Sequence, residues 1–322
     1  MLLQVILFCL LANAWFVEST DNVIADVGHS RSLLRKLHDE KIRRFWTAER
    51  LAAAEPMDVI LPSSSNRTVS NSSNMTIGSP SSVLGLTALH NGTRKRAISR
   101  DGQQVHTTGK VFWQSGEWMA SCSAAVVNSK SGDLIVTAAH CVYDTDTQTW
   151  FNNNNWMFVP AYSNGKKPYG TWTARNFLVN QAWISSRDYD YDVAFVALST
   201  LDGRHIQDVV GAQGIAFNQP RSAYTYSFGY PTNLDSGLYL KSCVGFTQNS
   251  PYIWNNYAGQ GLSCNMGRGC SGGPWMQDVV DATGIGYVTS VNSFTIDNAP
   301  NVMNGPYFET NIKSLYDQAS SM

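Results

Sequence analysis

The sequence is short of charge and has no long hydrophobic run. Asp, Glu, Lys and Arg make up 15% of its 322 residues, below the roughly 25% of an average soluble domain. Its 23 basic and 24 acidic residues nearly cancel, so it lacks the positive excess of a nucleic-acid-binding protein, and we expect no nucleic-acid partner. The longest apolar run, residues 2–11, is too short to cross a bilayer, and we expect no membrane partner. A hydrophobic content of 43% excludes an intrinsically disordered chain.

Residues 1–14 predict a signal peptide. The apolar run ends in Ala12-Asn13-Ala14, and small residues at the first and third of these positions suit a signal peptidase. We therefore expect cleavage after residue 14 and a secreted, extracellular protein.

The chain divides near residue 96 into two parts of different charge. Residues 1–96 hold 11 Lys and Arg against 8 Asp and Glu, a net charge of +3, whereas residues 97–322 hold 12 against 16, a net charge of −4. Residues 30–55 predict an amphipathic helix that Pro56 would end. Its apolar side chains recur among charges at near-helical spacing, at Leu34, Leu37, Phe45 and Leu51.

A Ser-rich segment follows the predicted helix. Residues 62–82 contain almost no large apolar group, so we expect them to be unstructured. The chain's N-glycosylation sequons all fall before residue 97, at Asn66, Asn71, Asn74 and Asn91. This grouping is typical of a solvated, glycosylated linker.

The linker ends in three consecutive basic residues, Arg94-Lys95-Arg96. A solvated charge run is one interpretation, but three adjacent cations in an exposed segment also fit the acidic cleft of a kexin-type processing protease. Their position at the junction of the two compositions favours cleavage after Arg96 by such a partner. We therefore expect a propeptide over residues 15–96 and a mature domain of 226 residues over 97–322.

The mature part has the sequence pattern of an all-β protein. Short apolar runs, including residues 134–137, 193–198 and 286–291, alternate with Gly, Asn, Asp, Ser and Pro. The one clear helical pattern lies at the end of the chain, where an apolar stripe comprises Ile312, Leu315, Tyr316 and Ala319. The sequence contains neither an HExxH motif nor a pair of CxxC motifs, so we expect no metal and no other cofactor.

Three short motifs supply a nucleophile, a base and an acid. His140 lies near the end of the run LIVTAAHC, Asp192 opens the run DVAFV, and Ser271 lies between the glycines of GCSGGP. A serine hydroxyl becomes a good nucleophile when a base removes its proton, and an imidazole has a suitable pKa. The imidazole in turn needs a carboxylate to fix its tautomer. Asp188 and Asp190 are alternatives for the acid, but Asp192 directly precedes a run that predicts a buried strand.

The order of the three groups along the chain separates two hydrolase folds. Residues 269–273 also match the GxSxG nucleophile elbow of α/β-hydrolases, in which the acid and then the His follow the Ser. All six His precede Ser271, and the last 51 residues contain none. The order His, Asp, Ser therefore excludes an α/β-hydrolase and is that of chymotrypsin.

The motifs resemble those of the trypsin/chymotrypsin superfamily of serine endopeptidases. TAAHC at 137–141 and GCSGGP at 269–274 carry the resemblance, which covers about residues 110–322. Two further stretches, FGYP at 228–231 and CNMGRGCSGGPW at 264–275, resemble the secreted trypsin-like and glutamyl-endopeptidase-like branch of microbes and fungi.

This resemblance implies an all-β fold of two packed six-stranded antiparallel barrels, followed by the C-terminal helix. The first barrel would cover about residues 97–205 and the second about 206–322, with the active site between them. The implied function is that of a secreted serine endopeptidase, made as a zymogen and acting as a monomer on a protein or peptide substrate.

The resemblance also assigns a role to each candidate residue. Ser271 would attack the scissile carbonyl to form an acyl-enzyme, His140 would act as base and then as acid, and Asp192 would orient His140. The backbone N–H groups of Gly269 and Ser271 would form the oxyanion hole.

The cysteines of the predicted mature part fit a secreted protein. One of them, Cys270, departs from the family pattern. The resemblance implies two disulfides, Cys122–Cys141 and Cys243–Cys264. Cys270 is left over, where the trypsin pattern has an Asp that receives the new amino terminus. The expected terminus Ala97-Ile98-Ser99 is not the usual Ile-Val-Gly-Gly, so we expect propeptide removal to unblock a preformed site instead. A catalytically silent homologue that serves as a binding module is the alternative, because Cys270 could accompany a collapsed oxyanion loop.

The specificity pocket has no charged residue at the position that decides between substrates. The resemblance places Asn265 at its base, where a trypsin-like preference for Arg or Lys needs an Asp. The His of glutamyl endopeptidases would align near Thr289, so a Glu preference is also unsupported. We expect Ser290, Val291 and Asn292 to line the pocket and bind substrate backbone as an added strand. We therefore expect a neutral or mixed substrate preference.

Overall fold

A computed structural model of the chain describes residues 22–26, 32–62, 76–88, 105–151, 155–252 and 256–322. The predicted signal peptide, all the sequons and the predicted cleavage site at Arg96 lie outside these ranges. Within them, no helix is long and apolar enough to cross a membrane.

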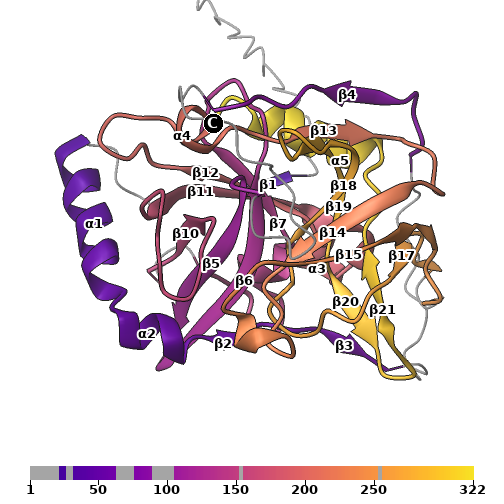
Figure 1. Cartoon of the computed structure of the whole chain (residues 1–322), viewed down its shortest axis with the longest axis horizontal. Coiled ribbons are helices and arrows are strands. Elements are labelled where there is room, and N and C mark those ends of the chain that lie inside the picture. The colour runs from indigo at the N-terminus through magenta and orange to yellow at the C-terminus, as the bar shows by residue number, and fades with distance from the viewer. Residues whose placement is uncertain (1–21, 27–31, 63–75, 89–104, 152–154, 253–255) are drawn as a thin grey trace, which may run out of the picture.

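Six antiparallel strands close into a barrel (Figure 1). Their hydrogen-bonded order is β11-β10-β5-β6-β7-β12, and β12 pairs again with β11. Two of the runs predicted to be strands form β7 and β12, and every residue of these two strands is buried. The barrel strands are β5 (Thr108–Ser115), β6 (Trp118–Val126), β7 (Leu134–Thr137), β10 (Met157–Pro160), β11 (Trp172–Asn180) and β12 (Ala194–Leu198).

The C-terminal half contains two further sheets. The larger has the order β15-β14-β18-β19-β13-β4 and the smaller the order β16-β17-β21-β20-β3. The predicted chymotrypsin-like fold is confirmed, but this half forms two sheets in place of a single closed six-stranded barrel, and one N-terminal strand extends each sheet. Its own strands are β13 (Gly214–Phe217), β14 (Tyr224–Gly229), β15 (Lys241–Phe246), β16 (Gln248–Asn249), β17 (Gln260–Ser263), β18 (Pro274–Val280), β19 (Ile285–Val291), β20 (Phe294–Ile296) and β21 (Ala299–Gly305).

The predicted C-terminal helix is present as α5 (Thr310–Ala319). All four residues of its apolar stripe are buried, and the Tyr316 ring contacts Phe195 of the barrel and Phe217 of β13. The helix therefore packs across both halves. The remaining short elements are α3 (Gln181–Ser186), α4 (Ile206–Val210), β8 (Tyr143–Asp144), β9 (Thr149–Trp150) and the 3-10 turns η1 (Ala139–Cys141), η2 (Tyr189–Tyr191) and η3 (Asp235–Gly237).

The predicted N-terminal helix is divided into α1 (Ser32–Phe45) and α2 (Ala48–Ala53). Thr47 lies between them and caps α2, because its hydroxyl accepts a hydrogen bond from the Arg50 N–H. Trp46 is also at the break, where it is buried and donates its indole N–H to the Asn155 carbonyl.

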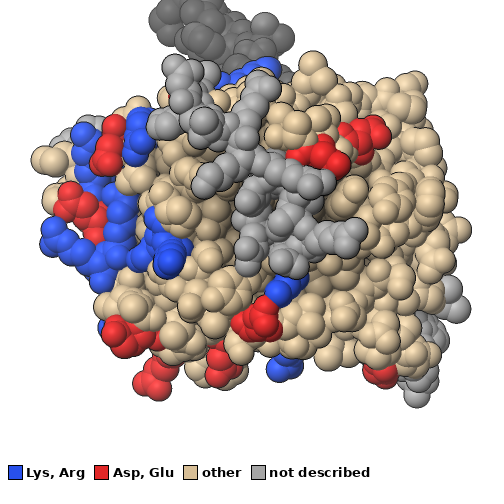
Figure 2. All heavy atoms as spheres, in the orientation of Figure 1, with Lys and Arg blue, Asp and Glu red and all other residues tan. Residues whose placement is uncertain are grey.

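The predicted buried face of this helix is only partly right. Leu34 and Leu37 are exposed, and the buried side chains are Ile42, Trp46 and Leu51. The break at residues 46–47 rotates the second helix relative to the first, so one helical period cannot describe both. Figure 2 shows Lys and Arg side chains gathered over α1, whose sequence contains Arg35, Lys36, Lys41, Arg43 and Arg44.

The N-terminal part also contributes four strands, each paired with a different strand of the rest of the molecule (Figure 1). β1 (Asn22–Asp26) pairs antiparallel with β11, β2 (Glu55–Pro56) parallel with β6, β3 (Ile60–Leu61) parallel with β20, and β4 (Ser81–Val83) antiparallel with β13. The prediction that residues 62–82 are unstructured is therefore wrong at its end. Ser81 and Ser82 have small polar side chains, and the pairing depends on their backbone groups instead.

We expect Leu315→Ala to lower the free energy of unfolding by about 2–5 kcal/mol, because it leaves a cavity between α5 and both halves. Ser314→Ala, at an exposed position of the same helix, is the matched control and should change it by less than about 0.5 kcal/mol. Urea unfolding measures both. Equal effects of the two substitutions would contradict the packing of α5.

Candidate active site

His140 and Asp192 form a buried pair at the ends of neighbouring strands. β7 delivers His140 in the turn η1, and Asp192 ends the turn η2 just before β12. The His140 Nδ1 atom lies 2.8 Å from Asp192 Oδ2, and the His140 backbone N–H donates to Oδ1 at 2.9 Å. These two contacts fix the ring's position and direct its Nε2 atom away from the carboxylate.

A third group completes the surroundings of Asp192. The Ser293 hydroxyl donates to Asp192 Oδ2 at 2.5 Å. Complete burial alone would raise the pKa of this carboxyl, but the His140 charge and the hydrogen bonds from His140 and Ser293 outweigh it, so the pKa lies below 3.8, its usual value. Asp192 therefore remains a carboxylate.

Asp188 and Asp190 have other partners. Asp188 accepts a hydrogen bond from the Asp190 N–H, and Asp190 accepts one from the Ala258 N–H. Burial, together with the Asp188 charge, raises the pKa of Asp190 to about 7. Of the three carboxylates considered from the sequence, Asp192 is the one that the structure pairs with His140.

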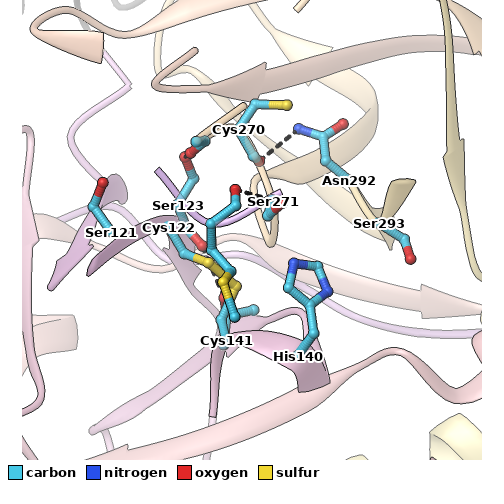
Figure 3. Close-up of a disulfide and its surroundings, with 12 residues drawn as sticks. Ser121, Cys122, Ser123, His140, Cys141, Cys270, Ser271, Asn292 and Ser293 are labelled. Atoms are coloured by element: carbon cyan, nitrogen blue, oxygen red, sulfur yellow. Dashed lines mark hydrogen bonds between the residues drawn. A yellow bond between two sulfur atoms is a disulfide. The ribbon is translucent and has the colours of Figure 1, made fainter. Parts of the chain in front are cut away.

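Ser271 lies on a loop that the first barrel holds in place (Figure 3). The Ser123 hydroxyl donates to the Gly269 carbonyl at 2.9 Å, and the Ser123 N–H donates to the Ser271 carbonyl at 2.7 Å. Gly269 has a φ of +93°, and a Cβ there would lie 2.7 Å from the Tyr230 carbonyl oxygen, so only glycine fits. With its carbonyl held by Ser123, Gly269 donates its own N–H to the carbonyl of Met57, from the N-terminal part.

Asn292 braces the same loop from the other side. Its fully buried side chain donates to the carbonyls of Cys270 (3.1 Å) and Phe228 (2.9 Å). Its oxygen accepts from Ser227 Oγ (2.6 Å) and Trp275 Nε1 (2.7 Å). The loop is thus held by a neutral amide, and both the NH₂ group and the oxygen of this amide form hydrogen bonds. Sequence analysis placed Asn292 in the specificity pocket and missed this role, since its partners are distant in sequence.

The structure contains both disulfides, with the expected pairs Cys122–Cys141 and Cys243–Cys264. The first lies beside His140 (Figure 3). His140, Cys122 and Cys141 lie close enough together to suggest a metal site, but disulfide sulfurs are not the thiolates that bind metal. The free Cys270 thiol is buried, and burial, with a smaller effect of the Asp58 charge, raises its pKa well above the usual value. A thiol in these surroundings is inert.

The predicted specificity residues differ in their exposure to solvent. Asn265 is exposed, and its carbonyl accepts from Asn233 Nδ2. Thr289, Ser290 and Val291 are buried, and Ser290 Oγ donates to the Pro306 carbonyl. The added-strand role of residues 290–292 stays a prediction. In this structure the strand that pairs with an extended segment is β20, beyond Ser293, and its partner is the parallel strand β3.

An extended chain is in fact present in the cleft, and it is the protein's own Met57. The Gly269 N–H donates to the Met57 carbonyl at 3.1 Å, and the Ser271 hydroxyl lies 3.5 Å from the same oxygen. The Met57 N–H donates to the Ser121 carbonyl at 2.9 Å. Ser271 and His140 are consequently only 3% and 5% exposed. The flanking strands β2 and β3 have two residues each, too few to show a sequence pattern.

Residues 97–317 match the family model described as Trypsin. The chain belongs to the trypsin family. Among solved structures, this trypsin-family protein is similar to the protease Anisep from Arthrobacter nicotinovorans, at 37% identity and a TM-score of 0.63, covering 69% of this chain and 99% of that one. A thermostable serine protease, AL20, from an extremophilic microorganism is 35% identical with a TM-score of 0.62, covering 68% and 98%.

A Glu endopeptidase shares the fold at 16% identity, with a TM-score of 0.55, and the match covers 74% of this chain and 98% of that one. No curated protein matches the chain. The family and its similar structures identify the protein as a chymotrypsin-like serine endopeptidase, a hydrolase.

We expect Asn292→Asp to lower kcat by about 100-fold, the scale of losing one oxyanion-hole donor, with a smaller effect on KM. An Asp side chain accepts from Ser227 and Trp275 but cannot donate to the Cys270 carbonyl. Ser227→Ala, which leaves both donated bonds of Asn292 in place, is the control. Steady-state kinetics of the processed enzyme measure the effect, and an unchanged kcat in Asn292→Asp would contradict the bracing role.

The lowered pKa of Asp192 predicts a loss of stability in acid. A carboxylate with a native pKa below 3.8 contributes fully above pH 3.8, and its contribution is lost as pH falls through the native value. The difference in unfolding free energy between the unsubstituted chain and Asp192→Asn should therefore shrink below about pH 4. Urea unfolding across pH 3–7 measures it. The exposed Asp317→Asn serves as control, and a difference independent of pH would contradict the assignment.

Proposed function

We propose that this trypsin-family endopeptidase is secreted, is made as a zymogen, and hydrolyses peptide bonds through Ser271, His140 and Asp192. The observation that carries the proposal is the contact at Gly269, whose N–H donates to a peptide carbonyl within reach of the Ser271 hydroxyl. Asp58, the residue after Met57, interacts electrostatically with His140, which is itself paired with Asp192. A peptide substrate would place its scissile carbonyl where that of Met57 now lies.

Each residue has one task in the proposed reaction. Ser271 Oγ attacks the carbonyl carbon while His140 Nε2 takes its proton, and Asp192 stabilises the imidazolium that forms. The developing oxyanion accepts hydrogen bonds from the N–H groups of Gly269 and Ser271. His140 then protonates the leaving amine, and water hydrolyses the acyl-enzyme by the same steps in reverse order.

The zymogen assignment rests on the path of the N-terminal part. Residues 15–96 would be the propeptide, and a kexin-type protease would cut after Arg96. Occupation of the cleft by residues of this part supports a latent form. The Asn292 brace supports a loop that is already formed before cleavage, which agrees with the absence of the usual Asp at position 270. Two disulfides support passage through an oxidising compartment.

We expect a fluorophosphonate to label Ser271 of the processed protein. His140→Ala should abolish labelling, because the hydroxyl then has no base, and should lower kcat by at least about 10⁴-fold. The matched control is His205→Ala. His205 forms a second His–Asp pair with Asp133 at 2.6 Å, and its side chain is 48% exposed.

Peptide mapping of the labelled protein identifies the modified residue. Labelling in His140→Ala at the unsubstituted rate, or a label on a residue other than Ser271, would overturn the proposed mechanism.

A further inference from the structure

Residues 55–61 are anchored along the cleft by more than the Met57 contact. The backbone N–H groups of Thr295 and Asp297 donate to the carbonyls of Val59 and Leu61, each at 3.1 Å. The side chains of Val59 and Leu61 pack against an apolar cluster formed by Tyr252, Phe294 and Ile296. The segment therefore forms hydrogen bonds with both halves of the molecule, at β6 and at β20.

Asp58 adds an ionic anchor next to the catalytic groups. Its carboxylate lies 3.5 Å from the guanidinium of Arg268 and is only 9% exposed. It also interacts electrostatically with His140. Arg268 directly precedes Gly269, so this ion pair ties the segment to the same loop that carries Ser271.

The bound segment is not arranged for cleavage. Attack requires Ser271 Oγ to be hydrogen-bonded to His140 and to face a carbonyl carbon. Here the Ser271 hydroxyl lies 3.5 Å from the Met57 carbonyl oxygen, and within the described residues the buried His140 Nε2 has no hydrogen-bond partner. Both β2 and β3 pair parallel with the cleft edges. A peptide of the opposite direction would pair antiparallel with these edges.

The same N-terminal part is also held far from the cleft. β1 pairs with β11 over five residues, and β4 pairs with β13 over three. Trp46 and Leu51 are buried. None of these contacts depends on the covalent connection through residue 96.

We propose that the N-terminal part, through its described residues 22–26, 32–62 and 76–88, acts as an inhibitor that stays bound to the peptidase after the chain is cut at Arg96. This inference rests on the proposed function. Cutting after Arg96 yields a complex of two chains in which Met57 still occupies the oxyanion site. Activity then requires a second event, the dissociation or proteolysis of the N-terminal chain, and the surface formed by β6, β20 and the Ser271 loop is the inhibitor's binding site.

The test uses the full chain, cut at Arg96 by a kexin-type protease and verified by mass spectrometry. Two variants loosen the segment: Val59→Asp places a charge in the apolar cluster, and Asp58→Asn removes the partner of Arg268. Their matched controls are Ile60→Asp, whose side chain points away from the cluster and is 55% exposed, and Glu55→Gln, at an exposed position of the same segment. The rate of fluorophosphonate labelling of Ser271 and turnover of a peptide library are measured for each.

The cut but unsubstituted protein should elute as one complex on gel filtration, with an intact Met57–Asp58 bond. Val59→Asp and Asp58→Asn should label at least about ten-fold faster than it does, corresponding to about 1.4 kcal/mol of lost inhibitor affinity. Ile60→Asp and Glu55→Gln should match the unsubstituted complex.

Three results would overturn the inhibitory role. One is a cut, unsubstituted complex that labels as fast as Val59→Asp and Asp58→Asn. The second is cleavage after Met57, which would make the segment a substrate. The third is separation of the two chains on gel filtration without denaturant. The absence of labelling in every variant, including after removal of the N-terminal chain, would instead overturn the proposed function, and the inhibitory role with it.

Discussion

A buried carboxylate sets the arrangement on which the rest of the site depends. Asp192 is completely buried, and a buried charge is tolerated only when all of its oxygens are well paired. Its partners come from both halves: His140 belongs to the barrel, and Ser293 lies between β19 and β20. This one charge therefore links the barrel to the C-terminal half next to His140.

The Ser271 loop is held by a neutral side chain, not by an ion pair. Trypsin-like proteins complete this loop with an ion pair to a new amino terminus, whereas here Cys270 stands at that position. The neutral Asn292 amide forms four buried hydrogen bonds and holds the loop without a net charge. A loop held in this way does not need cleavage to take its shape, so under the proposed function control of activity would fall on access to the cleft.

The sequence predicted the features that depend on residues close together along the chain. The motifs around His140 and Ser271, the strands β7 and β12, and the stripe of α5 are all short-range patterns. It was uninformative where the outcome depends on distant backbone groups. Met57 has no sequence feature that indicates its contact with Gly269, since the contact spans more than 200 positions and is made by a backbone carbonyl. The pairing of β20 with β3 was equally unpredictable, because backbone groups of two segments more than 200 positions apart form it.

The pairing of β4 with β13 has a consequence for the proposed release of the N-terminal part. β13 pairs with β19 on one side and with β4 on the other, and Ile215 and Phe217 of this strand are almost completely buried. Loss of β4 would leave a row of unpaired N–H and C=O groups at an apolar edge, which is a template for association between molecules. The N-terminal part, which occupies the cleft through residues 55–61, thus also covers an apolar sheet edge through β4, and a domain without it would expose that edge to association with other molecules.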